Sequence, residues 1–103
     1  MLNTLKRILG IGPKADYSAL IKAGATIIDV RTRGEYQSGH LKGSVNIPLQ
    51  QLPQQVSKLH KEKPIITCCA SGMRSGSAKS YLRAQGFQEV YNGGSWHTLN
   101  KYL

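Results

Sequence analysis

The chain has little of what marks several large protein classes. It contains only two cysteines, Cys68 and Cys69, which are adjacent and therefore too close for an ordinary disulfide bridge. No apolar run approaches the ~18 residues that a membrane span needs. No C-x-x-C pair occurs, and the three histidines stand at no recognisable ligand spacing, so we expect no zinc site. These absences predict a reduced, cytoplasmic protein that needs no metal or organic cofactor.

Acidic residues are also scarce. Five Asp and Glu stand against fourteen Lys and Arg, and the formal net charge is +9. Such a surface favours anionic partners, such as small oxyanions or acidic proteins. The basic residues are scattered from Lys6 to Lys101 without a run of like charges or interleaved aromatic residues, so nucleic acid is not expected as the main ligand.

The length of 103 residues predicts a single domain with its own core and leaves no room for a second. The amphipathic first nine residues lack a signal-peptide cleavage site, so we expect a short N-terminal helix and connection over 1–12 that packs on the domain and makes no membrane contact. The core should span residues 16–103, and a monomer is the default for this size.

Short apolar runs alternate with stretches of helical spacing along the core. Strands are predicted at 25–30, 44–47, 65–68 and 88–91, and helices at 17–23, around 34–37, over 49–59, at 77–85 and from Ser95, which should cap the last one, to Leu103. Residues 92–94 are predicted to form a turn. This alternation predicts an α/β fold with a mostly parallel central sheet of about five strands and helices on both faces.

The stretch from Pro64 to Ala78 is the most informative part of the sequence. A β-branched run typical of a buried strand leads into small residues around Gly72, and helix-forming sequence resumes from Ser75. A helix N-terminus, a turn of backbone N–H groups and the Arg74 guanidinium would each favour the thiolate form of a cysteine. Cys69 is therefore the candidate nucleophile, at the carboxyl end of a central strand where such folds bind ligands.

The residues of this loop, Cys69-Ala70-Ser71-Gly72-Met73-Arg74-Ser75, resemble the six-residue C-x-x-G-x-R active-site loop of single-domain rhodanese-like sulfurtransferases. A second block resembles the family upstream, and Gly93-Gly94-Ser95-Trp96 does so near the end. The upstream block consists of Asp29-Val30-Arg31, Glu35-Tyr36, Gly39-His40-Leu41, Gly43-Ser44 and Asn46-Ile47-Pro48-Leu49. The resemblance covers roughly residues 16–103 and implies a rhodanese-like fold.

The two cysteines leave a question of frame. Counted from Cys69, Arg74 is the sixth residue, as in the sulfurtransferase loop; counted from Cys68 it is the seventh, as in the C-x5-R loop of cysteine-dependent phosphatases. Six residues enclose a single sulfur, whereas seven leave room for a tetrahedral oxyanion. The apolar strand before Cys69 and the position of Gly72 favour the sulfurtransferase frame, in which Cys68 is a buried, inert strand residue.

The resemblance implies an enzyme, a thiosulfate sulfurtransferase that works in two steps through a persulfide on Cys69. The donor would be a small anion such as thiosulfate, or a persulfide, and the acceptor cyanide, a thiol, or a dithiol such as a thioredoxin-like protein. Donor and sulfane sulfur would be held by Ala70, Ser71, Gly72, Met73, Arg74 and Ser75. A third possibility is a rhodanese-like module that binds a partner without catalysis.

Individual side chains carry alternative roles. Arg74 would either bind the sulfite portion of the donor or close the loop by donating hydrogen bonds to carbonyl groups, and Ser75 is expected mainly to cap the helix. Asp29 and Arg31 would support the site as a pair, with Glu35 and His40 completing a polar cluster that pins the next segment. Trp96 would pack as core or pocket wall.

Overall fold

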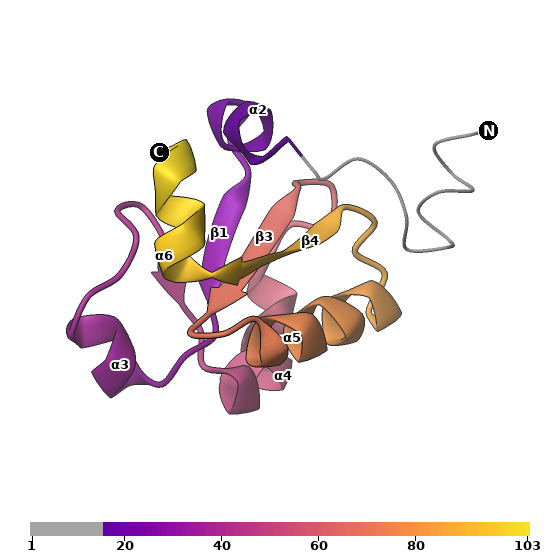
Figure 1. Cartoon of the computed structure of the whole chain (residues 1–103). Helices are drawn as coiled ribbons and strands as arrows, with labels where there is room; N and C mark the ends of the chain where they lie inside the picture. Colours follow the sequence, from indigo (N-terminus) through magenta and orange to yellow (C-terminus); the bar gives the residue numbers. More distant parts are fainter. Residues whose placement is uncertain (1–15) are drawn as a thin grey trace.

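The computed structural model describes residues 16–103, so the expected N-terminal helix lies outside the described residues. Helices and strands alternate along this part of the chain (Figure 1). In order they are α2 (Tyr17–Lys22), β1 (Thr26–Asp29), α3 (Arg33–Gln37), β2 (Val45–Asn46), α4 (Leu52–Gln55), β3 (Ile65–Cys69), α5 (Met73–Ala84), β4 (Val90–Ser95) and α6 (Trp96–Leu99). Short 3₁₀ turns at Leu49–Gln51 and Val56–Lys58 flank α4, and another at Asn100–Tyr102 follows α6.

The described strands form one parallel sheet in the order β2-β1-β3-β4. This confirms the α/β class and the parallel sheet, with four strands where about five were expected. All five side chains of β3 are buried, as expected for a parallel strand with both faces covered. In this order β3 lies between β1 and β4. Its carboxyl end is therefore flanked by the carboxyl ends of two neighbouring parallel strands.

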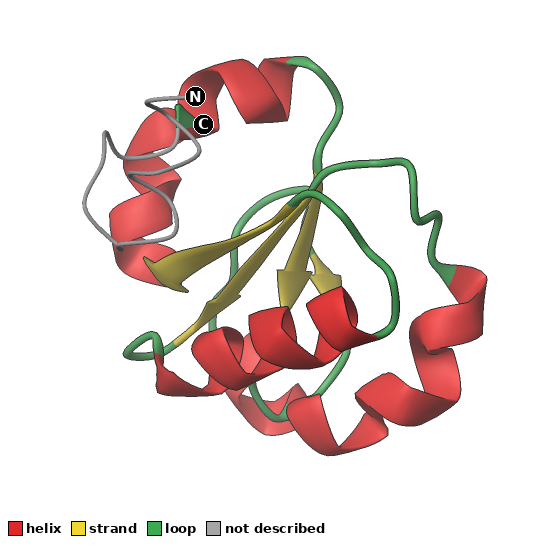
Figure 2. Cartoon of the chain, turned by 90° about the vertical axis from the view of Figure 1, so that its right-hand side faces the viewer, coloured by secondary structure: helices red, strands yellow, loops and turns green. Residues whose placement is uncertain are grey.

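Two apolar clusters cover the two faces of the sheet, and Figure 2 shows helices on both sides of it. One face packs on α4 and α5, through a cluster that includes Ile28, Ile65 and Leu82. The other packs on α2 and α6, through a cluster that includes Ile27, Ile66 and Leu99. Because successive side chains of a strand point to opposite faces, neighbouring residues of β1 and β3 fall into different clusters.

Side-chain caps explain where three of the helices begin. The Ser95 hydroxyl accepts from the N–H of His97 at 3.2 Å, which confirms the expected cap of α6. Asp16 accepts a hydrogen bond from the N–H of Ala19 at 3.0 Å, which confirms the expected start of α2. Thr32 and Glu35 form a reciprocal capping box at the start of α3. α3 lies within the segment that was predicted to be partly helical.

Three boundaries around the candidate loop differ from the sequence prediction. β3 includes Cys69 as its last residue, and α5 begins at Met73, because Gly72 takes the left-handed conformation (φ +105°) at the N-cap. β4 continues through the expected turn at 92–94. A Cβ on Gly93 would lie 2.8 Å from Cγ2 of Ile66 and 3.0 Å from the carbonyl oxygen of Thr67, so glycine lets β4 pass close to β3.

Candidate active site

A short loop leads from β3 into α5 (Figure 1). Backbone N–H groups of this loop and of the first turn of α5 point at the sulfur of Cys69. The N–H of Gly72 donates to Cys69 Sγ at 2.9 Å, and the N–H of Ser75 donates at 3.4 Å. The Cys69 side chain faces α5 and is fully buried. Two backbone amides from one turn therefore converge on one sulfur atom, an arrangement that stabilises negative charge.

The surroundings of Cys69 favour its thiolate. Burial alone would raise the pKa of this thiol, but the Ser75 hydroxyl and the Ser75 N–H oppose that effect. The N–H groups of Gly72 and Ser71 act in the same direction. The net result is a pKa below the ordinary value for cysteine, as a nucleophilic thiol requires.

Cys68 has the opposite environment. It is fully buried on the other face of the sheet, in the cluster packed against α2 and α6. Burial, followed by the charge of Asp29, raises the pKa of its thiol to about 12. A loop built around Cys68 would need the amides to reach across the sheet, so this geometry argues against the seven-residue phosphatase frame.

Arg74 pairs with a carboxylate of another helix and, within the described residues, is not seen to close the loop on carbonyl groups; donor binding by Arg74 stays a prediction. Its guanidinium forms a two-pronged ion pair with the Glu35 carboxylate, at 2.7 and 3.0 Å. The pair joins α3 to the first turn of α5, and both side chains are about one-third exposed. The Arg74 hydrogen bond, followed by the Thr32 backbone N–H, holds the pKa of Glu35 at about 2. Glu35 therefore anchors the loop arginine across 39 residues of sequence.

Asp29 and Arg31 form a buried pair on the Cys68 side of the sheet. Nε and Nη2 of Arg31 donate to the Asp29 carboxylate at 2.7–3.0 Å, and the side chains are 5% and 0% exposed. Nη2 also donates to the carbonyl oxygen of Gly39 at 2.7 Å, and the guanidinium lies 4.8 Å from the Trp96 ring centroid. These contacts fix the segment after β1.

Trp96 and His40 lie away from the Cys69 sulfur. Trp96 packs with the cluster on the α2 and α6 face, so it serves as core, one of its two expected roles. His40 is exposed, stacks on Tyr36 with 3.8 Å between ring centroids, and its Nδ1 lies 2.7 Å from the Tyr36 carbonyl oxygen.

The other predicted loop residues form the outer rim of the site. Ala70 and Ser71 are exposed, and Met73 is 80% exposed. Their side chains therefore face solvent, while the backbone of the same turn faces the sulfur.

Ser75 is not a helix cap, since Gly72 holds that position without a side-chain cap. The buried Ser75 hydroxyl lies between Cys69 Sγ (3.4 Å) and Oδ1 of Asn92 (2.6 Å). Asn92 was missed as a site residue because its position was predicted to be part of a turn. One sequence signal could have found it: a polar residue at the carboxyl end of the strand next to β3.

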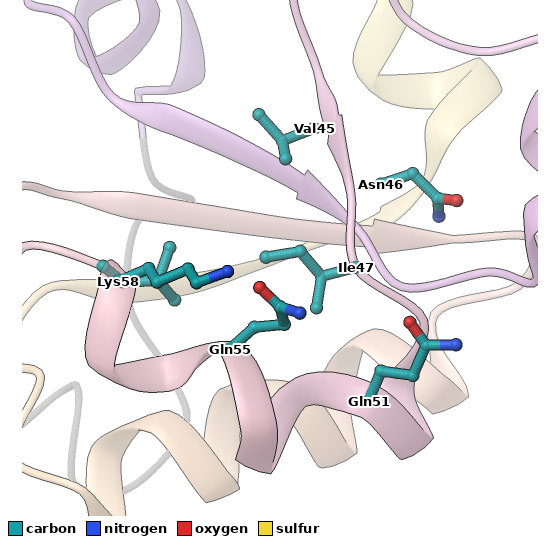
Figure 3. A pocket seen from close by; sticks show the side chains of 7 residues that line it. Val45, Asn46, Ile47, Gln51, Gln55 and Lys58 are labelled. Carbon is teal, nitrogen blue, oxygen red and sulfur yellow. The ribbon is translucent and has the colours of Figure 1, made fainter.

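A hollow of about 310 Å³ lies elsewhere, between β2 and the α4 segment (Figure 3). Its lining residues are Val45, Asn46, Ile47, Gln51, Gln55, Lys58 and Leu59. It contains none of the predicted site residues. Within residues 16–103, the structure shows no helix that is both long and apolar enough to cross a bilayer, and no group of three or more His, Cys, Asp or Glu side chains placed to hold a metal ion.

Comparisons with known proteins agree with this geometry. The sequence is 35% identical to thiosulfate sulfurtransferase GlpE of Pseudomonas savastanoi pv. phaseolicola. That match extends over 80 residues, which are 78% of this chain and 76% of the relative. It is 43% identical over 68 residues to uncharacterized protein YqhL of Bacillus subtilis, of whose length the match spans 54%. The solved structure described as rhodanese with anions from E. coli superposes with a TM-score of 0.69 at 31% identity, over 73% of this chain and 91% of that one. The family model of the rhodanese-like domain matches residues 14–96, and this chain belongs to that family.

Proposed function

We propose that the protein is a thiosulfate sulfurtransferase that carries a sulfane sulfur on Cys69. The observation that supports this most directly is the pair of backbone N–H groups aimed at Cys69 Sγ, at 2.9 and 3.4 Å. A single sulfur bound to Sγ would meet the same donors. The Pseudomonas relative, a thiosulfate sulfurtransferase at 35% identity, supports the same reaction.

The proposed reaction has two steps. The Cys69 thiolate attacks the outer sulfur of thiosulfate, a new S–S bond forms, and the S–S bond within thiosulfate breaks as sulfite leaves with its electron pair. The terminal sulfur of the Cys69 persulfide then accepts attack from a nucleophile such as cyanide, a thiol or a thioredoxin-like dithiol. The second S–S bond breaks, and the Cys69 thiolate is regenerated.

Access to Sγ requires a small movement, because the Cys69 side chain is fully buried. Either the side chain rotates or the exposed segment of Ala70 and Ser71 lifts before the outer sulfur reaches it. Both side chains are small, and the left-handed Gly72 ends the segment. Thiosulfate is a small anion that presents a terminal sulfur to the nucleophile, so it suits this entrance better than a bulky ester.

The direct test is conversion of thiosulfate and cyanide to thiocyanate by the reduced protein. Cys69→Ser should abolish the reaction, and Cys68→Ser, the matched neighbouring variant, should retain most of it. Mass spectrometry after thiosulfate treatment should find one added sulfur on Cys69. Hydrolysis of an aryl phosphate that depends on Cys68 would support the phosphatase alternative instead, and the absence of both activities would favour a binding module.

A further inference from the structure

The side chain of Asn92 contacts two groups of the loop that surrounds Cys69. Its Nδ2 donates to the carbonyl oxygen of Gly72 at 3.1 Å, and its Oδ1 accepts from the Ser75 hydroxyl at 2.6 Å. Gly72 and Ser75 are the same two residues whose N–H groups point at Cys69 Sγ. One amide thus holds both ends of the turn that faces the sulfur.

The backbone of β4 aims Asn92 at the loop. Thr67 pairs with Asn92 and Cys69 with Ser95, so β4 has one more residue than β3 over this stretch. This is a β-bulge, and Gly94 within it has φ +76°. The Tyr17 hydroxyl donates to the Asn92 carbonyl oxygen at 2.9 Å and ties the bulge to α2.

The orientation of the Asn92 amide follows from its neighbours. The N–H of Gly94, which can only donate, lies 2.9 Å from Oδ1, whereas the carbonyl of Gly72, which can only accept, faces Nδ2. If the amide were flipped, its NH₂ group would face the N–H of Gly94 and its oxygen would face the carbonyl oxygen of Gly72. Because Oδ1 therefore faces Ser75, the Ser75 hydroxyl must donate its single hydrogen to Asn92.

That assignment determines how the hydroxyl meets the sulfur. Because the Ser75 hydroxyl gives its hydrogen to Asn92, its oxygen can only accept a hydrogen bond from Cys69. The neutral thiol of Cys69 is that donor, and its Sγ lies 3.4 Å from Ser75 Oγ. In the thiolate, the hydroxyl turns its hydrogen to the sulfur. Oδ1 of Asn92 then keeps the N–H of Gly94 as a partner, so this turn leaves no buried oxygen without a hydrogen bond.

We propose that Asn92 is a positioning residue for sulfur transfer: it orients the Gly72 peptide and the Ser75 hydroxyl toward Cys69 and releases the hydroxyl hydrogen when the thiolate forms. This inference rests on the proposed role of Cys69 as the nucleophile. The charged groups nearest the loop are Arg74 and Glu35, which are paired with each other. The balance at the sulfur is therefore set mainly by the neutral groups that Asn92 holds.

The test compares Asn92→Asp with Asn46→Asp. Asn46 is a matched control, since it is also a half-buried strand residue and its side chain donates to two backbone carbonyls, those of Asp29 and Arg31, but on the far side of β1 from the loop. The reaction of Cys69 with iodoacetamide across pH gives the thiol pKa without any need for sulfur transfer. Both variants are measured in a Cys68→Ala background.

Asn92→Asp should raise the midpoint of this titration by about one pH unit, because a carboxylate holds the hydroxyl hydrogen more strongly and repels the thiolate. At a pH below both midpoints, alkylation should then slow about tenfold. Asn46→Asp should shift the midpoint by less than a third of that amount. In a Ser75→Ala background, the effect of Asn92→Asp should fall to less than half, as expected if it acts through the hydroxyl.

A midpoint within 0.2 pH units of the parent for Asn92→Asp, or an equal shift for Asn46→Asp, would overturn the proposal. If Asn92→Asp does not fold, Asn92→Ala provides the measurement, and the proposal then requires at least a fivefold loss of kcat/KM for thiosulfate that Asn46→Ala does not share. A wild-type protein that makes no thiocyanate would overturn the proposed function, yet the alkylation experiment would still give its own answer about Asn92.

Discussion

The two sides of the sheet at the end of β3 hold adjacent cysteines in opposite chemical settings. On the α5 side, Cys69 meets hydrogen-bond donors from a tight turn. On the α2 and α6 side, Cys68 lies in an apolar cluster and is close enough to the buried Asp29 for that charge to raise its pKa. The difference arises from the alternation of side chains along a strand, which sends neighbouring residues to opposite faces.

The comparison shows that burial alone does not decide the reactivity of a thiol. Both cysteines are fully buried. Burial raises the pKa of either thiol, but only on the Cys69 side is that effect outweighed by N–H groups and a hydroxyl. The polar groups on the other side, Asp29 and Arg31, satisfy each other and maintain the fold.

Selective alkylation is the largest effect we expect from this contrast. With a pKa of about 12, Cys68 has on the order of one thiolate per 10,000 molecules at pH 8, whereas Cys69 ionises below the ordinary range. Iodoacetamide at pH 8 should therefore modify Cys69 at least about 100 times faster than Cys68, as measured by peptide mass spectrometry. Both should react alike in denaturant, and equal rates in the folded protein would remove the distinction.

Much of the fold and part of the site could be predicted from local sequence. The cap at Asp16, the buried strand before Cys69 and the turn of small residues each depend on neighbours within a few positions. The sequence pattern also placed Cys69 next to the connection between the buried strand and the following helix, although Cys69 is itself the last residue of β3. These features follow from propensity and spacing.

The rest depends on contacts between residues far apart in the chain. Glu35 and Arg74 are 39 positions apart, and Ser75 and Asn92 are 17. No local pattern predicts that Arg74 turns away to Glu35, or that a bulge after Thr67 aims Asn92 at the loop. The strand through 92–94 was predicted as a turn because Asn-Gly-Gly usually forms one, whereas here Gly93 allows β4 to approach β3 closely.

Breaking the polar pair on the Cys68 side should reduce stability and leave the Cys69 side intact. Arg31→Met removes the partner of a buried carboxylate, a kind of change that costs about 3–5 kcal/mol. Urea unfolding should show a free energy of unfolding that is lower by about that amount, while the alkylation titration of Cys69 stays unchanged. Adding Asp29→Asn should recover part of the lost stability, because it removes the unpaired buried charge. The new side chain keeps an oxygen that can still accept from the backbone N–H of residue 31. A shift in the Cys69 titration would mean that the two sides are coupled.

Glu35→Gln breaks the partly exposed ion pair between α3 and α5, and we expect its effect to be the smallest. The folded-state pKa of Glu35, about 2, is below its ordinary 4.5, so the ion pair contributes stability above about pH 4.5 and loses it as pH falls toward 2. The variant should therefore unfold at a slightly lower temperature than wild type at pH 6, and the two should converge near pH 2. Freed from Glu35, Arg74 should attract thiosulfate more strongly and lower its KM by about twofold with kcat unchanged, whereas Arg74→Met should raise KM. A higher KM for Glu35→Gln would instead mean that the carboxylate holds Arg74 in the orientation that the donor needs.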